Sequence, residues 1–538
     1  MSKNNGLLVS AYSLKLLVNG GEIEQSSLIR ITENDTFRLE LELNSEEVIN
    51  KVYLHTDMTS DHLQLLPLKK NGGSYYTEMK PVRCGRTSFR FAAETDEAVL
   101  WEPDDYHQIL TDPAFMDSVR MYTLIPNITG PVSAWTEKLA DIHRMGFNAV
   151  HILPFTSMGA SESPYSAADL FSIDDVYGGS IDEFKKFTET AAQLGIIICL
   201  DIVLNHVGSD NIICREHGNW IVPDRSRSDG MKRAGCYHHD SWISWEDLVL
   251  VNYDHPDLSS RYEIYDYMLA YVLFWIEASG GENVMLRLDN LHSSNTHFIK
   301  WIIPEIRKKH PGIIILSEFF GADSQIDEAV SDYGLNLITA NSWEFPFAPD
   351  LQRYISSIHN RGGSVKYFLS PVSHDTESAA ELFGTADSSI PRFAACALMG
   401  TGITGTVQGY EKGIEQKINF IGRNPEMPEE SERDYGSFIA EVNKLLEKEK
   451  CLHEKANIEF YDTCNDSLIV CRRRDVEGGS ILIAVNLDIY NTHHLDYPII
   501  GGADTVLNER AEVAHDRNDD RIHIKLEACG VCAVRTGR

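Results

Sequence analysis

The sequence predicts an α/β fold in which a (β/α)8 TIM barrel lies between an N-terminal and a C-terminal β sandwich. Two observations predict it. Eight short apolar runs, separated mostly by amphipathic stretches, occupy about residues 115–450, a pattern typical of β–α units around parallel strands. On either side of them, apolar and polar residues alternate with period two, which indicates antiparallel strands. We therefore predict domains at residues 1–112, 113–450 and 451–538.

The two flanking domains are predicted from alternating segments bounded by turn residues. In the N-terminal domain these segments include SLIRITENDTFRLELEL at 27–43 and INKVYLHT at 49–56, and Asn71-Gly72-Gly73 marks a turn further on. In the C-terminal domain, RIHIKLEACGVCAVRT at 521–536 begins with the same alternation. Strands of this kind bury one face and expose the other, as in a sandwich.

Each predicted barrel strand is an apolar run of strand length, followed in most cases by a stretch with helical periodicity. A doubly wound open sheet is the alternative, but no Gly-rich phosphate loop follows any run. One connection, at about residues 206–260, has room for a small excursion between the third and fourth strands. The runs are SVRMYTLI (118–125), NAVHILP (148–154), IIICLDIVLN (196–205), NVMLRLD (283–289), GIIILSE (312–318), LNLITA (335–340), VKYFLSPV (365–372) and GITGTVQ (402–408).

Composition and charge argue against several classes of protein. Of the 538 residues, 43% are hydrophobic and 24% are charged, which are ordinary values for a globular chain. The net charge of −32 disfavours binding to nucleic acid or anionic membranes but is indifferent to neutral sugars. No apolar run reaches the roughly 18–20 residues that cross a bilayer, and the N-terminus does not resemble a secretory signal. With ten scattered cysteines, we expect a cytoplasmic protein without nucleic-acid or membrane partners; its oligomeric state is not predicted.

Polar clusters lie at the carboxyl ends of four of the predicted strands, where barrels of this type carry their chemistry. A single acidic residue at such a place is more often an ordinary loop carboxylate. Four clusters at strand ends instead indicate a site. They are Asp201, Asn205 and His206 after the third strand, Arg287, Asp289, Asn290 and His292 after the fourth, Glu318 after the fifth, and His374 and Asp375 after the seventh.

Two of these carboxylates suit the cleavage of a glycosidic bond. A retaining glycosidase needs a nucleophilic carboxylate and a carboxylic acid about 5–5.5 Å apart. Side chains two residues apart on a strand share a face, so Arg287 can keep Asp289 ionised. Glu318 follows an apolar run and precedes two phenylalanines, surroundings that favour the protonated form of a general acid.

The order Asp-x-x-x-Asn-His, Arg-x-Asp, Glu and His-Asp resembles the α-amylase superfamily, glycoside hydrolase family 13, over roughly residues 115–410. SPYSAADLFSIDDVYGG at 163–179 resembles a further segment of that family. The resemblance implies Asp289 as the nucleophile, Glu318 as the general acid/base and Asp375 as a third carboxylate that holds two sugar hydroxyls. It also implies supporting residues: Arg287 beside the nucleophile, His206 and His374 along the donor sugar, Tyr165 stacked beneath it, and Asp201 against the arginine. Asn205 matches a position that is often a calcium ligand, but we expect no metal or other cofactor.

The residues after the nucleophile favour transfer to a sugar over hydrolysis. Many amylases continue as Asp-x-x-Lys-His, whereas this chain has Asp289-Asn290-Leu291-His292. The string is similar to the glucanotransferase half of glycogen debranching enzymes and to maltosyltransferases that use maltose 1-phosphate. We therefore expect a 4-α-glucanotransferase of glycogen or maltodextrin metabolism, acting on an α-glucan or malto-oligosaccharide that Asn290 and His292 help to bind. The alternatives are an α-amylase-type hydrolase, a maltosyltransferase using maltose 1-phosphate, and a catalytically silent glucan-binding scaffold.

The excursion carries two further groups of residues. Four aromatic rings could stack on an acceptor sugar or form the core of the excursion itself: Trp220, Tyr237, Trp242 and Trp245. Five cysteines and histidines could bind zinc, although their spacing matches no familiar finger: Cys214, His217, Cys236, His238 and His239. We favour a reading without metal.

Overall fold

The computed structural model describes residues 11–23, 28–44, 48–60, 62–103, 105–238, 241–281, 284–361, 363–429, 431–453, 456–499, 502–516 and 520–537. The chain falls into two compact units. One comprises Met1–Ala114, Ile299–Ile314 and Gly321–Asn336, and the other comprises Phe115–Phe298, Ile315–Phe320 and Leu337–Arg538. The three-domain division drawn from the sequence stays a prediction.

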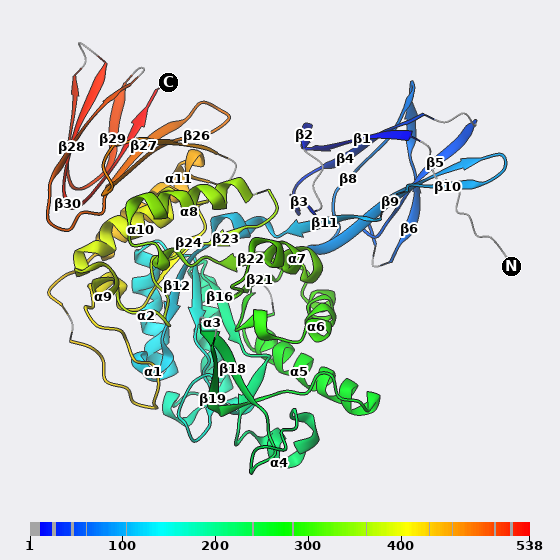
Figure 1. Cartoon of the computed structure of the whole chain (residues 1–538), viewed down its shortest axis with the longest axis horizontal. Helices are drawn as coiled ribbons and strands as arrows, with labels where there is room; N and C mark the ends of the chain where they lie inside the picture. The colour runs from blue at the N-terminus through cyan, green and yellow to red at the C-terminus, as the bar shows by residue number, and fades with distance from the viewer. Residues whose placement is uncertain are drawn as a thin grey trace. The chain divides into compact units, whose positions relative to one another are not determined.

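The larger unit contains a barrel of eight parallel strands (Figure 1). Their order is β23-β22-β21-β20-β16-β13-β12-β24, and a bridge between Leu369 and Thr404 joins the two ends of this order. Each strand lies within one of the eight apolar runs, so the predicted barrel is confirmed. The strands are β12 (Arg120–Leu124), β13 (Ala149–Ile152), β16 (Ile197–Ile202), β20 (Val284–Leu288), β21 (Ile314–Ser317), β22 (Leu337–Thr339), β23 (Tyr367–Phe368) and β24 (Thr404–Val407).

Burial on both faces explains why these strands appear in the sequence as continuous apolar runs. Every residue of β16 and of β20 is buried, as expected of parallel strands covered by helices. Asp201 and Arg287 lie near the carboxyl ends of these two strands and pair across them in register. The barrel therefore places their charged groups side by side at one end of its core.

Helices follow most of the barrel strands along the chain. Helix α3 (Ile181–Gln193) begins with a capping box. In it, Ser180 Oγ accepts a hydrogen bond from the Glu183 N–H (3.2 Å), and the Glu183 carboxylate accepts one from the Ser180 N–H (3.0 Å). Among the described residues, no helix is long and apolar enough to cross a membrane. The helices of the barrel region are α1 (Pro126–Thr129), α2 (Val132–Arg144), α3 (Ile181–Gln193), α5 (Leu258–Ala278), α6 (Thr296–Lys309), α7 (Asp323–Tyr333), α8 (Ala348–Arg361), α9 (Ala379–Phe383), α10 (Ser389–Leu398) and α11 (Gly436–Lys448).

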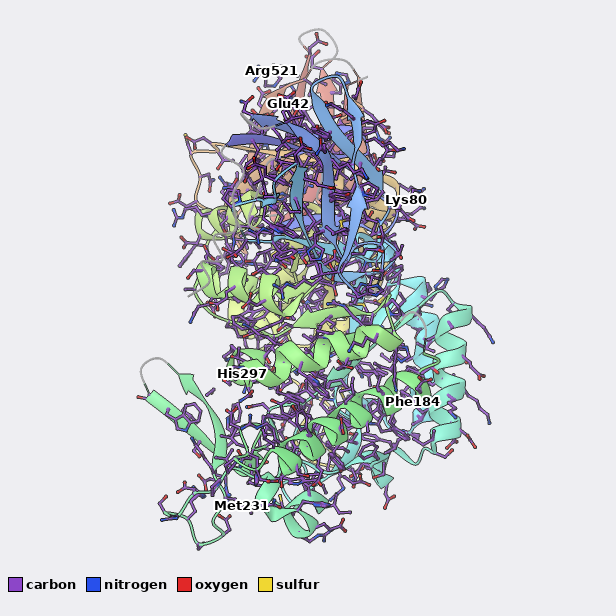
Figure 2. The ribbon with its side chains drawn as sticks, turned by 90° about the vertical axis from the view of Figure 1, so that its right-hand side faces the viewer. Glu42, Lys80, Phe184, Met231, His297 and Arg521 are labelled. Atoms are coloured by element: carbon purple, nitrogen blue, oxygen red, sulfur yellow. The ribbon has the colours of Figure 1, made fainter. Side chains whose placement is uncertain are left out.

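The predicted excursion is a small three-stranded sheet with a short helix, α4 (Ile212–Glu216). In this sheet, β19 (Ser241–Leu250) pairs with β17 (His206–Gly208) on one side and with β18 (Arg233–His238) on the other. The β18–β19 pair extends as a two-stranded ribbon near Met231 (Figure 2). A separate hairpin of β14 (Thr156–Met158) and β15 (Ala167–Ile173) follows the second barrel strand. Because β17 begins at His206, the excursion starts within a few residues of Asp201.

The N-terminal residues form two sheets that share one core, as predicted. The sheets have the orders β2-β1-β4-β8-β7 and β3-β11-β9-β5-β6, with β10 added to β9. Buried side chains from both sheets pack together, Phe37 and Leu39 from the first with Phe89 and Phe91 from the second. The strands are β1 (Ala11–Val18), β2 (Gly21–Ile23), β3 (Leu28–Thr32), β4 (Phe37–Asn44), β5 (Ile49–Thr56), β6 (Gln64–Pro67), β7 (Lys69–Asn71), β8 (Ser74–Met79), β9 (Gly85–Thr95), β10 (Val99–Trp101) and β11 (His107–Asp112).

The C-terminal residues form a single six-stranded sheet instead of two separate ones. Its order is β25-β26-β27-β30-β28, and β29 pairs with β30. The long strand β30 pairs with β27 through residues 531–535 and with β28 through residues 521–526. Apolar side chains from both parts of this sheet, such as Leu482 on β27 and Ile524 on β30, pack in one core. One continuous sheet therefore encloses the core for which two sheets were predicted. The strands are β25 (Asn457–Tyr461), β26 (Leu468–Arg474), β27 (Ser480–Asn486), β28 (His493–Pro498), β29 (Ala503–Asp516) and β30 (Arg521–Thr536).

Candidate active site

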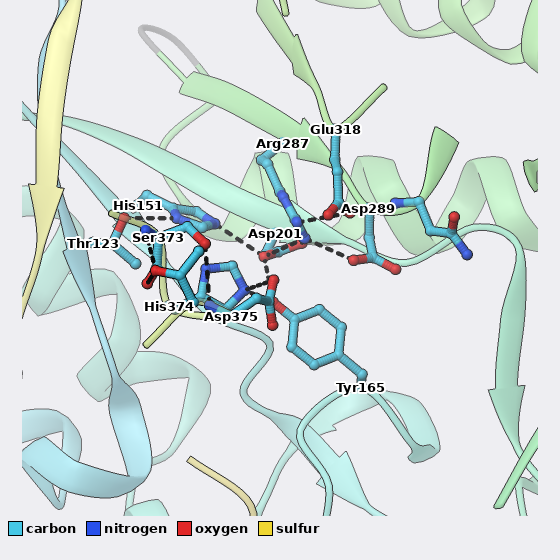
Figure 3. A network of polar contacts seen from close by, with 12 residues as sticks. Thr123, His151, Tyr165, Asp201, Arg287, Asp289, Glu318, Ser373, His374 and Asp375 are labelled. Atoms are coloured by element: carbon cyan, nitrogen blue, oxygen red, sulfur yellow. Dashed lines mark hydrogen bonds and ion pairs between the residues drawn. The ribbon is translucent and has the colours of Figure 1, made fainter. Parts of the chain in front are cut away.

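Arg287 is the centre of a charged cluster at the carboxyl ends of β16, β20 and β21 (Figure 3). Its Nη1 lies 2.9 Å from Asp201 Oδ1 and 2.7 Å from Asp289 Oδ1. Its Nη2 lies 2.9 Å from Glu318 Oε2. A planar guanidinium can hold several carboxylates in fixed directions. The two carboxylates predicted as nucleophile and acid are therefore held by the two ends of one guanidinium.

A second series of contacts joins Asp375 to Asp201 (Figure 3). His374 Nε2 lies 3.0 Å from Asp375 Oδ2 and 2.7 Å from the Tyr165 hydroxyl, and this hydroxyl donates to Asp201 Oδ2 at 3.0 Å. The rings of Tyr165 and His374 are nearly parallel, at 9°. The Asp375 side chain is 52% exposed, whereas Asp201 and the other residues of this series lie deeper. Asp375 thus lies at the rim of the cluster.

The electrostatics of Asp289 differ from the sequence-based expectation. Burial raises its pKa well above the ordinary value; Arg287 opposes this shift, and Glu318 adds to it. At Asp201 burial also raises the pKa, but Arg287 and His151 outweigh it and the net pKa is lowered. The buried Asp289 therefore holds a proton more readily than a solvent-exposed aspartate would.

A cavity of about 210 Å³ lies beside the cluster. Its walls include Arg287 and Glu318, together with the rings of Phe320, Trp343 and Phe368. Phe320 and Trp343 meet edge to face, with their centroids 6.4 Å apart. Pockets for small molecules combine apolar and aromatic walls with a few fixed polar groups. This cavity can therefore take a ring that presents both an apolar face and hydroxyl groups.

Asn290 and His292 lie beside Glu318, on the loop after β20 and in the short 3-10 helix η4 (Leu291–Ser293). The Asn290 N–H donates to Glu318 Oε2 at 2.9 Å. The His292 ring lies 6.1 Å from that of Phe320, centroid to centroid. Burial lowers the pKa of His292, and Glu318 opposes this shift. Both residues are thus close to the predicted acid.

His206 and Asn205 lie at the start of the excursion, and neither is among the described residues that line the 210 Å³ cavity. Both ring nitrogens of His206 and the Nδ2 of Asn205 are buried and have no hydrogen-bond partner in the part of the chain that the structure describes. Trp245 contacts the His206 ring edge to face at 5.9 Å. Because an unpaired buried polar group is unfavourable, a ligand hydroxyl that reached His206 would gain a hydrogen bond at no cost to the protein's own contacts.

Protein stability is expected to fall between about pH 6.5 and 4 because of His206. Burial lowers the pKa of His206 to about 4, with Asp247 opposing, whereas histidine in an unfolded chain has a pKa of about 6.5. The unfolded state then binds more protons, so the free energy of unfolding decreases through this window by about 3 kcal/mol in all and is level above it. Urea unfolding at several pH values should show a shallower pH dependence for His206→Gln than for the wild type. Equal slopes would contradict the prediction. Burial also lowers the pKa of His359 to about 4, but this residue is present in both proteins, so its contribution cancels in the comparison.

The aromatic residues of the excursion differ in burial and in the rings they contact. Trp220 is buried and stacks on His217 at 4.0 Å, so it belongs to the core of the excursion. Trp245 contacts His206 and Trp242 is 47% exposed. The side chain of Tyr237 lies outside the described residues.

The zinc alternative draws no support from the residues that can be placed. Cys214 Sγ donates to the Gly208 carbonyl at 3.6 Å, and His217 packs on Trp220. The His238 side chain and His239 lie outside the described part of the chain. Within that part, no three His, Cys, Asp or Glu side chains gather in a way that could hold a metal ion.

His151 is a site residue that the sequence reasoning missed. Its Nε2 lies 3.0 Å from Asp201 Oδ2 and its Nδ1 lies 3.1 Å from Thr123 Oγ1 (Figure 3), and it lines the cavity. The signal was a single histidine in the otherwise apolar run NAVHILP. Trp343 and Phe368 were also not predicted as parts of the site, because they come from other segments of the chain.

The sequence is similar to one family model and to several curated proteins. Residues 113–221 match the family model described as glycogen debranching enzyme, glucanotransferase domain. The chain is 26% identical over 385 residues to the α-1,4-glucan:maltose-1-phosphate maltosyltransferase of Myxococcus xanthus, covering 65% of this chain and 55% of that protein. It is 23% identical over 417 residues to the protein of the same name from Picrophilus torridus, covering 71% and 63%.

Solved structures share the fold over more of the chain. A cyclomaltodextrinase superposes with a TM-score of 0.62 at 18% identity, covering 93% of this chain and 96% of that one. The chain shares the fold of the α-amylase superfamily. An α-amylase from Lactobacillus plantarum, another structure with this superfamily's fold, gives a TM-score of 0.61 at 17% identity over 78% of this chain and 99% of its own. The chain spans 55% and 63% of the lengths of the two maltosyltransferases.

Proposed function

We propose that this chain is a retaining α-glucan-active enzyme that passes a glycosyl unit from an α-1,4-glucosidic bond to a sugar acceptor. The observation that carries the proposal is the pair Asp289 and Glu318, held by the two ends of the Arg287 guanidinium. Paired carboxylates of this kind cleave glycosidic bonds by double displacement. That Asp289, Glu318 and Asp375 are all present argues against a catalytically silent scaffold.

The proposed mechanism assigns a role to each carboxylate. Asp289 attacks the anomeric carbon and forms a covalent β-glycosyl-enzyme, while Glu318 gives its proton to the departing glycosidic oxygen. Glu318 then takes a proton from the acceptor hydroxyl, whose oxygen attacks the same carbon and releases Asp289. Asp375, at the rim of the cluster, holds two hydroxyls of the donor sugar.

The choice between transfer and hydrolysis depends on which acceptor reaches the glycosyl-enzyme. Phe320 and Trp343 line the cavity next to Glu318, and His292 lies beside Phe320. Rings in this position offer a stacking surface to a sugar and reduce the space for water. They support transfer over an α-amylase-type hydrolase.

The donor favoured by the cavity is an uncharged glucan, which makes a 4-α-glucanotransferase our first candidate. Among the described residues that line the cavity, the only Lys or Arg is Arg287. Three carboxylates already contact its guanidinium. Glu318 and Asp375 in the same wall would repel a phosphate ester. Transfer from maltose 1-phosphate is the second candidate, because the maltosyltransferases match about two thirds of this chain.

Incubation with maltoheptaose is expected to yield both longer and shorter chains while the total number of reducing ends stays constant. Transfer breaks one α-1,4 bond for each bond it forms, whereas hydrolysis adds one reducing end per event. The measurement is a time course of product lengths and of reducing ends, with Asp289→Asn as the blank. A steady rise in reducing ends with shorter products alone would contradict transfer. Release of inorganic phosphate from maltose 1-phosphate, with maltoheptaose unchanged, would favour the second candidate.

A further inference from the structure

Asn290 adopts a backbone conformation that few residues other than glycine reach. It follows the predicted nucleophile directly and has φ 44° and ψ 44°, in the left-handed region. This region is unfavourable for L-residues, and asparagine is among the few that occupy it at little cost. Such conformations persist where the surrounding structure holds them, and they cluster at functional sites.

The left-handed turn directs two consecutive backbone donors at Glu318. The Asn290 N–H donates to Glu318 Oε2 at 2.9 Å, and the Leu291 N–H donates to the Glu318 carbonyl at 3.0 Å. The loop after β20 thus holds both the backbone and the carboxyl group of Glu318. Arg287 Nη2 reaches the same Oε2, also at 2.9 Å.

Two donors on one carboxyl oxygen decide where a proton on that group can lie. Oε2 accepts from an N–H and from a guanidinium, so a hydrogen on Oε2 would point at donors that already occupy its lone pairs. A proton on Oε1 lies away from both donors. When the proton leaves Oε1, the two donors at Oε2 stabilise the negative charge that develops on the carboxylate.

We propose that Asn290 is a positioning residue whose left-handed backbone presents its N–H to Glu318 Oε2, so that Oε1 carries the proton given to the leaving oxygen. This inference rests on the proposed function, in which Glu318 is the acid. The proton passes from Oε1 to the glycosidic oxygen as its bond to the anomeric carbon breaks. It returns to Oε1 from the acceptor hydroxyl in the second displacement, while Oε2 keeps both of its donors throughout.

The side chain of Asn290 can be separated from this backbone role. Its Nδ2 is buried and has no hydrogen-bond partner among the described residues, so the side chain does not anchor Glu318. Glycine keeps the left-handed turn without a side chain. Alanine also lacks the amide but is disfavoured in this conformation. Comparing Asn290→Gly with Asn290→Ala therefore separates the effect of the backbone conformation from the effect of losing the amide.

The test compares two donors in the full-length protein. We expect kcat/KM for maltoheptaose to be about 10- to 100-fold lower in Asn290→Ala than in Asn290→Gly, a part of what a general acid contributes, because both variants lack the amide and only glycine keeps the left-handed turn at little cost. With α-maltosyl fluoride, whose leaving group needs no proton, kcat/KM should agree within about threefold between the two variants. Retained turnover of the fluoride also shows that each variant is folded. Asn19, left-handed at φ 51° in the N-terminal domain, supplies the control variant Asn19→Ala, which should leave both donors unaffected.

Equal losses of kcat/KM for maltoheptaose in Asn290→Gly and Asn290→Ala would overturn the inference, because the side-chain amide and not the backbone conformation would then be required. So would an equal loss on both donors in Asn290→Ala, which would show a defect other than proton transfer. Failure of the proposed function looks different: the wild type itself would turn over neither donor, or Asp289→Asn would be as active as the wild type.

Discussion

Replacing Asp289 by asparagine is expected to lower turnover of maltoheptaose by about four to six orders of magnitude, the scale seen when a covalent nucleophile is removed. Asparagine has almost the same shape but does not form the glycosyl-enzyme. The fold should survive, and its melting temperature should be unchanged or higher, because burial and Glu318 raise the pKa of Asp289 and make its charge costly in the folded state. Steady-state kinetics and circular dichroism measure the two effects.

The matched control for Asp289→Asn is Glu318→Gln. It should also fail on maltoheptaose, but it should still release fluoride from α-maltosyl fluoride in a first turnover, since that step needs no acid. Asp289→Asn should release none. If the two variants behaved alike on the fluoride, the assignment of nucleophile and acid would be wrong.

Replacing Arg287 by leucine is expected to abolish activity and to lower the free energy of unfolding by about 3–5 kcal/mol at neutral pH, the range for removing one partner of a buried ion pair. Its guanidinium contacts Asp201, Asp289 and Glu318. Without it, these carboxylates face one another in a site that is largely closed to water. Denaturant unfolding at pH 7 measures the loss.

The loss in Arg287→Leu should shrink as the pH falls toward 5. Carboxylates without their cation have raised pKa values in the folded state, so the folded state binds more protons and gains stability as the pH decreases. Arg287→Lys should lose less stability than Arg287→Leu, since an ammonium keeps the charge but not the planar fork. A loss in Arg287→Leu that grew on acidification would contradict this account of the cluster.

The barrel and its polar strand ends could be predicted because each signal is local. Parallel strands buried on both faces leave continuous apolar runs, such as the one around β16, and the residue types at the ends of these runs are visible directly. Arg287 and Asp289 were paired from their spacing alone, and the structure places them 2.7 Å apart. The raised pKa of Asp289 was not predictable, because Glu318 and the side chains that bury Asp289 come from other segments of the chain.

Other parts of the site depend on contacts between distant segments. His151 lies in an apolar run, and its role appears only when β13 is placed beside Asp201. Asparagine occurs in turns for several reasons, so the sequence at Asn290 did not show a left-handed turn aimed at Glu318. In the C-terminal region the alternating pattern predicted strands correctly, but it does not encode which strands pair, and a single sheet took the place of two.

The pairing of β30 has a consequence for the order of events during synthesis. This strand is hydrogen-bonded to β27, β28 and β29, and all three of these precede it in the chain. Ribosomes deliver a chain from its N-terminus, so β28 has no described strand to pair with until residues 521–526 have emerged, and the edge of β27 stays open until residues 531–535 follow. The barrel strands are all translated before residue 408. The barrel can therefore begin to assemble while the chain is still being made, whereas the C-terminal sheet must close after β30 leaves the exit tunnel.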